Sequence, residues 1–200
     1  ALPLFVWMGE ILFRTKLSEN LFKGLSPWLS KLPGGLIHVN VVGCGLFAAI
    51  SGSSAATVAT VGKMSIPELR KRKYPEKILL GSLAGSGTLG LLIPPSIILI
   101  IYGVTIEDSI AKLFMAGIFP GIMLAIIFML YVVVWSILNK DQMPKISEEF
   151  SFIEKIKRSK QLLPVVLLIS AVIGSIYTGI ATATEAASLG VVGALILSLF

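Results

Sequence analysis

Two apolar stretches of this sequence are interrupted by polar, helix-breaking residues. The first interruption is Ser51-Gly52-Ser53-Ser54, and the second runs from Gly85-Ser86-Gly87-Thr88 to Pro94-Pro95. A broken helix turns its C-terminal carbonyl oxygens toward a cation and its N-terminal N–H groups toward an anion. Serine and threonine hydroxyls supply further oxygen ligands for a small cation such as Na⁺. Both interruptions are therefore candidate binding segments.

The second interruption contains Pro94 and Pro95, which have no backbone N–H and therefore break an α-helix. The carbonyls one turn earlier, around Gly90 and Leu91, are expected to lose their partners within the helix. The alternative for either segment is a proline kink with close Gly/Ser helix packing that binds nothing. Two interruptions that face each other across a hairpin favour binding over that alternative. The second segment offers Ser86, Gly87, Thr88 and residues 90–95.

Residues that usually carry enzyme chemistry are scarce in this sequence. His38 is the only histidine, and no plausible metal-ligand partner stands at a useful spacing from it. The sequence has no phosphate-binding P-loop and no pair of active-site carboxylates. We therefore expect no enzyme activity and no cofactor, and we assign His38 a structural role. Cys44 is the only cysteine, and we expect it to pack among apolar residues.

Two carboxylates, Glu10 and Glu185, lie among apolar residues. Ionisable groups at membrane depth are functional candidates by default. Glu185 follows Thr182 and Thr184 in a pattern typical of a helix start, where an acidic residue faces the positive end of the helix dipole. We expect a structural role for Glu185. For Glu10 a structural and a functional role both stay open.

The composition indicates a membrane protein. Hydrophobic residues make up 55% of the chain and charged residues 14%, and the mean hydropathy is +0.90. Four runs without a charged side chain exceed the roughly 20 residues that cross a hydrocarbon core of about 30 Å. These runs are 36–62, 78–104, 113–139 and 161–184. We expect an all-α polytopic fold.

The positive charges predict the orientation of these runs. All 17 Lys and Arg residues lie in 14–31, 63–77, 105–112 and 139–160, and the third stretch contains only Lys112. Loops rich in Lys and Arg face the cytoplasm, which explains the net charge of +6 without a nucleic-acid partner. A single crossing by residues 36–62 would place the two basic stretches beside it on opposite sides. We therefore expect a re-entrant hairpin, with a single tilted helix as the alternative.

Two further features concern the beginning and the ends of the chain. Residues 14–34 carry apolar side chains at helical spacing among Lys and Ser. This pattern is typical of an amphipathic arm that lies along the membrane interface. Both ends of the sequence lie in apolar runs, so we expect a piece of a longer protein.

The interrupted segments and their surroundings resemble the large membrane subunit (the M or DctM-like subunit) of TRAP transporters, the tripartite ATP-independent periplasmic transporters of the wider ion-transporter superfamily. The matching stretches are LPLFVWMGEIL, PGGLIHVNVVGCGLFAAISGSSAATVATVG, GSGTLGLLIPPSIILIIYG, KLFMAGIFPGIMLAIIF and YTGIATATEAASLG. They occur in the family's order and span nearly the whole chain. The combination is specific, whereas SGSS or IPPS alone would be weak.

The resemblance implies an inverted-repeat, elevator-type transporter with a re-entrant hairpin and a broken helix. The chain would cover most of the first repeat and the start of the second. The implied segments are the end of a scaffold helix at 1–13, an interfacial arm at 14–34, the re-entrant hairpin at 35–66, the broken transmembrane helix at 78–104, a transmembrane helix at 113–138, a cytoplasmic loop at 139–160, a transmembrane helix at 161–180 and the start of the second repeat at 181–200.

The resemblance also implies where ligands bind, between the hairpin tip and the broken helix. Sodium would be the only metal, and no other cofactor is implied. The cation-binding residues would be Ser51, Gly52, Ser53, Ser54, Gly87, Thr88, Gly90 and Pro94. The substrate-binding residues would be Ser54, Ser86, Pro95 and Ser96. A second hairpin and a second broken helix, beyond residue 200, would complete the site.

For function, the resemblance implies a large permease subunit in the bacterial inner membrane that takes up an organic acid, such as a dicarboxylate or sugar acid, with Na⁺. The implied partners are a small Q-type membrane subunit, a periplasmic substrate-binding protein, the anionic substrate and the lipid bilayer. Many members carry an acidic residue shortly after the SGS turn, where this chain has Ala55, Ala56 and Thr57. This departure leaves the Na⁺ stoichiometry and the substrate open. The alternatives are a passive channel and a non-transporting membrane scaffold subunit.

Overall fold

The structure is a computed structural model that describes residues 1–15, 17–144 and 150–199, and within these ranges it forms helices and no strand. Parts of the predicted segments 14–34, 139–160 and 181–200 fall on Lys16, residues 145–149 and Phe200, outside the described residues. The helices are α1 (Leu2–Arg14), α2 (Leu17–Leu29), α3 (Ile37–Ser51), α4 (Ser54–Lys71), α5 (Glu76–Gly87), the 3₁₀ helix η1 (Thr88–Leu91), α6 (Ile97–Thr105), α7 (Ile110–Leu138), the 3₁₀ helix η2 (Lys140–Gln142), α8 (Phe152–Ser159), α9 (Leu163–Tyr177) and α10 (Ala183–Ser198).

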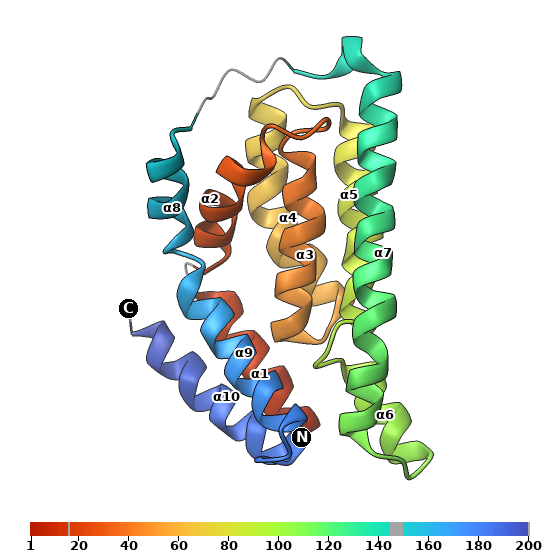
Figure 1. Ribbon diagram of the computed structural model, residues 1–200, viewed down its shortest axis with the longest axis vertical. Helices are drawn as coiled ribbons and strands as arrows, with labels where there is room; N and C mark the ends of the chain where they lie inside the picture. Colours follow the sequence, from red (N-terminus) through yellow and green to blue (C-terminus); the bar gives the residue numbers. More distant parts are fainter. Residues whose placement is uncertain (16, 145–149, 200) are drawn as a thin grey trace.

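The helices form two groups along the long axis of the molecule (Figure 1). In one group α3, α4, α5 and α7 pack together, and α6 continues below them. In the other group α1 packs with α10, and α10 with α9, while α2 and α8 form a pair above them. One apolar core joins the groups and contains Phe5 and Met8 of α1, Phe47 of α3 and Val191 of α10.

α3 and α4 form a helical hairpin with Gly52 and Ser53 at its tip. α3 is buried along almost its whole length. It ends because Gly52 adopts a left-handed conformation with φ of 59°, which glycine takes at little steric cost. Ser53 then caps α4, and its Oγ accepts a hydrogen bond from the backbone amide of Ala56 at 3.4 Å.

The break expected within 78–104 lies between α5 and α6. α5 passes at Gly87 into the 3₁₀ turn η1, and α-helix resumes only at Ile97. Pro94 and Pro95, which are joined by a cis peptide bond, lie in between. Since neither proline can donate a backbone hydrogen bond, a continuous α-helix cannot form there.

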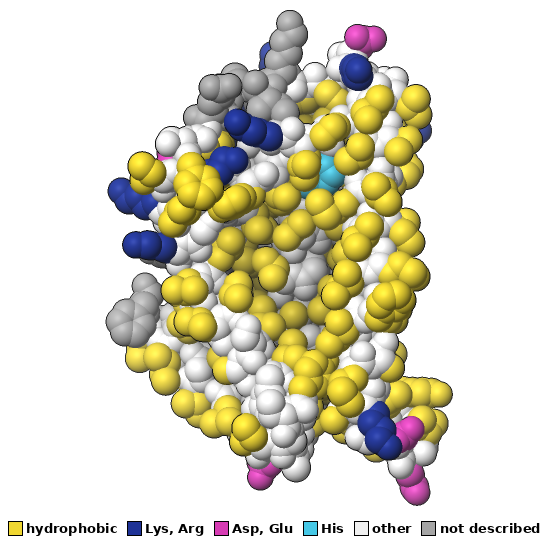
Figure 2. Space-filling view, in the orientation of Figure 1, with side chains coloured by type: hydrophobic (Ala, Val, Ile, Leu, Met, Phe, Trp, Pro, Cys, Tyr) yellow, Lys and Arg dark blue, Asp and Glu magenta, His cyan; other side chains and the backbone are white. Residues whose placement is uncertain are grey.

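α7 is the one helix of the described chain that is long and apolar enough by itself to cross a membrane. Its 29 residues extend about 43 Å at 1.5 Å per residue. α8 and α9 pass the same test only together, and the chain bends by 54° between them. The outer side of α7 carries exposed apolar side chains along its length (Figure 2), including Phe119, Ile122, Ile126, Leu130 and Val134. An apolar surface of this extent is typical of a lipid or protein contact.

The predicted loop at 139–160 contains a helix, α8, that the sequence analysis did not expect. Exposed Phe152, Ile153 and Ile156 recur there at helical spacing among charged residues. Glu154 and Arg158 form a salt bridge of 2.8 Å across one helical turn, and such i,i+4 pairs support a helix. The amphipathic pattern of α8 covers only eight residues. It is therefore difficult to recognise in a stretch rich in charged residues.

One face of α2, which lies within the predicted interfacial arm at 14–34, packs against the rest of the protein. Leu21, Phe22 and Leu25 are buried, and α2 contacts α3, α4 and α8. The indole N–H of Trp28 donates a hydrogen bond of 2.7 Å to Ser159 Oγ at the end of α8. Trp28 itself stays 45% exposed. α2 and α8 therefore act as a pair, with one apolar face of α2 turned into the protein.

Candidate functional site

The tip of the α3–α4 hairpin is shaped by backbone geometry at Gly52. Its N–H donates to Ala48 O at 2.9 Å, which closes α3, while its own carbonyl accepts a hydrogen bond of 3.1 Å from the backbone amide of Ile97. A Cβ atom at Gly52 would lie 2.7 Å from Pro95 O. Only a residue without a side chain fits so close to that carbonyl, so the tip contacts the second interruption directly.

The hydroxyl groups of the tip differ in how they are satisfied. Ser51 Oγ lies 2.9 Å from Thr57 Oγ1, so this hydroxyl pair joins the two arms of the hairpin. Ser53 Oγ caps α4. Ser54 Oγ is buried and has no hydrogen-bond partner in the described part of the chain. Because buried hydroxyls are normally paired, Ser54 is the tip residue with an oxygen available to a ligand.

Glycines of the second interruption let its backbone approach the tip. A Cβ atom on Gly90 would lie 2.8 Å from Ser54 N and 3.0 Å from Ser53 C. A Cβ atom on Gly87 would overlap the side chain of Val58, one turn further along α4. The two interruptions therefore face each other, with the Ser53–Ser54 peptide against η1.

Ser96 supplies a hydrogen bond that the proline pair cannot make. The carbonyl of Leu91, which Pro95 cannot reach with a backbone N–H, accepts a hydrogen bond of 2.8 Å from Ser96 Oγ. Ser96 is fully buried, and its Oγ also lies 3.5 Å from the amide of Leu99, which it caps. The hydroxyl of Ser96 thus replaces the backbone N–H that the prolines lack.

Two expected site residues point elsewhere. Ser86 Oγ donates to Ser82 O at 2.6 Å and lies 3.3 Å from the carbonyl of Asn40 on α3. Thr88 is exposed, and its hydroxyl donates to Gly85 O at 2.6 Å. The structure thus gathers Ser51 to Ser54, Gly87, Gly90, Pro95 and Ser96 around the contact of the two interruptions. Pro94 is buried within the same loop.

Three glycines outside both interruptions complete this contact, and sequence reasoning missed them. On α7, a Cβ atom at Gly117 would lie 2.6 Å from Leu92 O, and one at Gly121 would lie 3.0 Å from Ile93 Cγ1. On α1, a Cβ atom at Gly9 would lie 2.9 Å from Ser51 Cα. The i,i+4 spacing of the α7 glycines is a small-residue packing signal that could have identified that pair.

The remaining polar candidates have structural contacts. His38 Nε2 lies 2.8 Å from Pro33 O. Glu185 and Thr182 form a capping box at the start of α10, in which the Thr182 amide donates to Glu185 Oε2 at 2.8 Å. Glu10, whose role was open, forms an exposed salt bridge of 2.8 Å with Arg14. No group of three or more His, Cys, Asp or Glu side chains gathers among the described residues.

Comparison with known proteins assigns the chain to a family. Residues 1–200 match the family described as tripartite ATP-independent periplasmic transporter, DctM component. The C4-dicarboxylate TRAP transporter large permease protein DctM of Pseudomonas aeruginosa is 35% identical over 100% of this chain and 46% of its own length. The ectoine TRAP transporter large permease protein TeaC of Halomonas elongata is 36% identical over 98% of this chain and 45% of its own length.

A third relative is named DctMQ, a name that joins the letters M and Q. The isethionate TRAP transporter permease protein DctMQ of Oleidesulfovibrio alaskensis is 35% identical over 100% of this chain and 31% of its own length. The chain thus spans less than half the length of each of these relatives. They are transporter permeases rather than enzymes. The chain belongs to the DctM family, the large permease component of tripartite ATP-independent periplasmic transporters.

Proposed function

We propose that this chain forms part of a permease that couples the uptake of an organic acid to Na⁺ entry across the bacterial inner membrane. The observation that carries the proposal is the contact between the two interruptions, where Gly90 lies against the Ser53–Ser54 peptide. Broken helices that meet at membrane depth are the usual setting of a transporter's binding site.

The depth of this contact supports a re-entrant hairpin. The second interruption packs on Gly117 and Gly121, seven and eleven residues into α7. At 1.5 Å per residue, these two glycines lie about 10–16 Å from one end of α7 and about 25–32 Å from the other. The hairpin tip touches the same loop, so it ends inside the span of α7. The basic stretches 14–31 and 63–77 then both face the cytoplasm.

The chemistry of the contact fits a small, hard cation. The available groups are oxygens: the buried Ser54 hydroxyl and backbone carbonyls at the ends of broken helices. Such oxygens would hold Na⁺ without a carboxylate, in keeping with Ala55 and Ala56 after the tip. The sequence also assigns to the cation Ser51, Gly52, Ser53, Gly87, Gly90 and Pro94, and to the substrate Ser54, Pro95 and Ser96. These assignments remain part of the proposal. Ser86 would act through its hydrogen bonds to Ser82 and Asn40, and the exposed Thr88 through the bond of its hydroxyl to Gly85 O.

The coupling of the tip to the second interruption supports an elevator mechanism. The hydrogen bond between Ile97 N and Gly52 O and the close packing of Gly90 join the hairpin to η1 and α6. We expect these elements to move as one body against a scaffold that includes α2. A passive channel and a non-transporting scaffold subunit are less favoured, since neither needs two broken helices in contact.

The relatives indicate the class of substrate and partners. Their names cite a C4-dicarboxylate, isethionate and ectoine, so small polar solutes that carry an acidic group are the expected cargo. The compound name DctMQ supports a Q-type small subunit beside the permease. A periplasmic binding protein would deliver the solute.

Two serines of α4 provide the test. Ser54 and Ser65 both have buried hydroxyls without a partner in the described residues, but only Ser54 lies at the tip. The complete permease, with its small subunit and binding protein, is reconstituted in proteoliposomes, and uptake is measured against Na⁺ concentration. Ser54→Ala should weaken the apparent Na⁺ affinity about tenfold. The contact between a hydroxyl oxygen and a charged group contributes roughly 1.5 kcal/mol to binding.

The matched variant Ser65→Ala should leave the Na⁺ dependence unchanged. Uptake that needs no Na⁺ gradient in the unmodified protein would favour the channel. Equal Na⁺ dependence in both variants would remove Ser54 from the site.

A further inference from the structure

α8 turns its apolar side chains away from the rest of the protein. Phe152, Ile153 and Ile156 are exposed by 66%, 77% and 46%. With 3.6 residues per turn, these three side chains lie within about 100° of one another around the helix axis and form one apolar stripe. In a helix that faces water, charged residues would take the exposed side instead.

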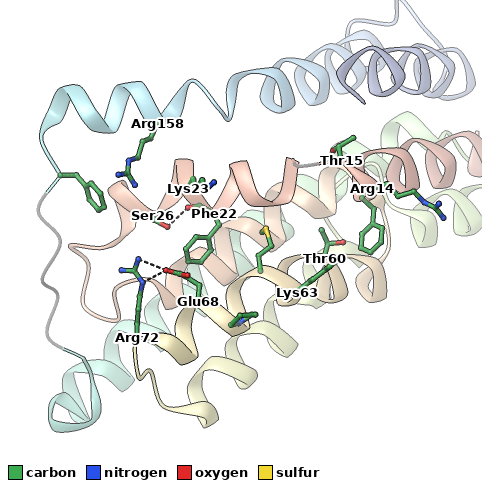
Figure 3. A pocket seen from close by; sticks show the side chains of 14 residues that line it. Arg14, Thr15, Phe22, Lys23, Ser26, Thr60, Lys63, Glu68, Arg72 and Arg158 are labelled. Atoms are coloured by element: carbon green, nitrogen blue, oxygen red, sulfur yellow. Dashed lines mark hydrogen bonds and ion pairs between the residues drawn. The ribbon is translucent and has the colours of Figure 1, made fainter. Parts of the chain in front are cut away.

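The side of α8 that faces α2 is polar. Ser159 Oγ accepts the hydrogen bond from the Trp28 indole, and Lys155 Nζ lies 5.4 Å from the centre of the same ring. Arg158 points from α8 toward α2, where it lines a cavity of about 770 Å³ between α2 and α4 (Figure 3). The polar groups of α8 are therefore turned toward the protein, and the apolar stripe is turned toward its surroundings.

α8 also lies where the chain enters an apolar run. Lys160 is the last charged residue before the uncharged run 161–184, which is long enough to cross a hydrocarbon core. α8 ends at Ser159, and the chain bends by 54° before α9 begins at Leu163. Because lysine and arginine flank membrane spans at the level of the headgroups, α8 lies at this boundary and at an angle to the span that follows.

The residues around the apolar stripe are typical of a headgroup region. The Trp28 ring is 45% exposed and lies edge-on to Phe152, with 6.4 Å between the ring centres. Tryptophan is enriched at this level of a membrane. Exposed Lys157 borders the stripe, and a lysine in this place can extend its ammonium group to the headgroups. Lysine is depleted from protein–protein interfaces, so these neighbours favour lipid over a protein partner.

We propose that the apolar stripe of α8 inserts into the bilayer between headgroups and acyl chains, so that α8 lies along the membrane surface as an interfacial helix. Helices of this kind bury their apolar face about 5–10 Å into that boundary. Through the bond between Trp28 and Ser159, α8 would hold α2 at the same level. It would add a second helix to the interfacial arm predicted at 14–34. This inference rests on the membrane location of the family and not on the solute or on Na⁺ coupling.

Spin labels on neighbouring residues of α8 test the proposal. Ile153→Cys places a label on the stripe, Glu154→Cys places one on the polar side, and Asp141→Cys in η2 is a water-exposed reference. Cys44 is buried, and other accessible cysteines of the complete permease and its small subunit are replaced. In lipid nanodiscs, collisions of each label with O₂, which concentrates in lipid, and with a water-soluble nickel chelate are measured by electron paramagnetic resonance.

We expect the ratio of O₂ to nickel collisions to be severalfold higher at Ile153 than at Asp141, with a lower ratio at Glu154 than at Ile153. A ratio at Ile153 equal to that at Asp141 would place the stripe in water and overturn the proposal. Protection of the Ile153 label from both reagents would show that the small subunit or a second copy covers the stripe, which would also overturn it. None of these readings uses transport, so failure here is distinguishable from failure of the Na⁺ test.

Discussion

The backbone amide of Ile97 donates a hydrogen bond to the carbonyl of Gly52 over a distance of 3.1 Å. This bond connects the first residue of α6 with the tip of the α3–α4 hairpin. The carbonyl at the end of α3 and the amide at the start of α6 have no partner within their own helices. Each of these two backbone groups therefore supplies the hydrogen-bond partner that the other lacks. The tip and the second interruption are thus one structural unit, and substitutions in either should affect both.

Gly90→Ala should damage this unit. The added Cβ would lie 2.8 Å from Ser54 N, a backbone atom that cannot rotate away. We expect a loss of about 1–3 kcal/mol in stability and a strong loss of uptake in proteoliposomes, while membrane insertion is retained. Thermal unfolding and uptake are measured together. Gly81→Ala is the control, because a Cβ on Gly81 of α5 meets nothing within 4 Å; wild-type-like behaviour of both variants would contradict the contact.

A comparison of Gly52→Ala with Gly179→Ala distinguishes the cost of the left-handed backbone conformation from the cost of the contact with Pro95. Both glycines have positive φ, 59° and 71°, so both substitutions cost about 1–2 kcal/mol for the left-handed conformation. Only at Gly52 would the Cβ also meet Pro95 O, at 2.7 Å, whereas Gly179 has open space. Gly52→Ala should therefore lower the thermal midpoint more than Gly179→Ala. Equal shifts would mean that the tip does not pack against the second interruption.

Trp28→Phe should loosen α8. The substitution keeps a ring beside Lys155 but removes the indole N–H that donates to Ser159 Oγ at 2.7 Å. We expect faster proteolytic cleavage around α8 in the variant, with an effect equivalent to about 1 kcal/mol. Ser159→Ala should act similarly, and the double variant should add little to either single change. Full additivity of the two effects would show that the bond does not form.

Glu185→Gln should leave uptake close to that of the unmodified protein. The side chain serves a capping box with Thr182, and glutamine can accept the same hydrogen bond. Thr182→Ala removes the cap and should cost about 1 kcal/mol of stability, read from the thermal midpoint. Abolished uptake in Glu185→Gln with an unchanged midpoint would instead give this carboxylate a direct role in transport.

The hairpin tip and the proline break were predictable because each depends on local backbone chemistry. Gly52 supplies a left-handed residue, Ser53 an N-cap, and Pro94–Pro95 remove two donors, and these properties belong to the residues themselves. The distribution of positive charges predicted the re-entrant hairpin, and the resemblance to TRAP permeases implied that its tip lies beside the broken helix.

What could not be predicted depends on residues far apart in the chain. Gly9, Gly117 and Gly121 matter because residues far away in the chain approach them. The i,i+4 spacing of the α7 pair signals helix packing, but it does not reveal which segment packs there. Ser86 and Ser96 look alike in sequence, but one donates within α5 and the other to the carbonyl of Leu91. The direction of each hydroxyl is decided by the packing around it.

α1 and α10 pack against each other although they are made far apart in time. About 170 residues separate them, which at about 5–20 residues per second corresponds to roughly 10–30 s of synthesis. Through that interval the apolar face of α1 that holds Phe5 and Met8 lacks one of its final neighbours. We therefore expect lipid or an insertion factor to cover this face of α1 until α10 has been synthesised.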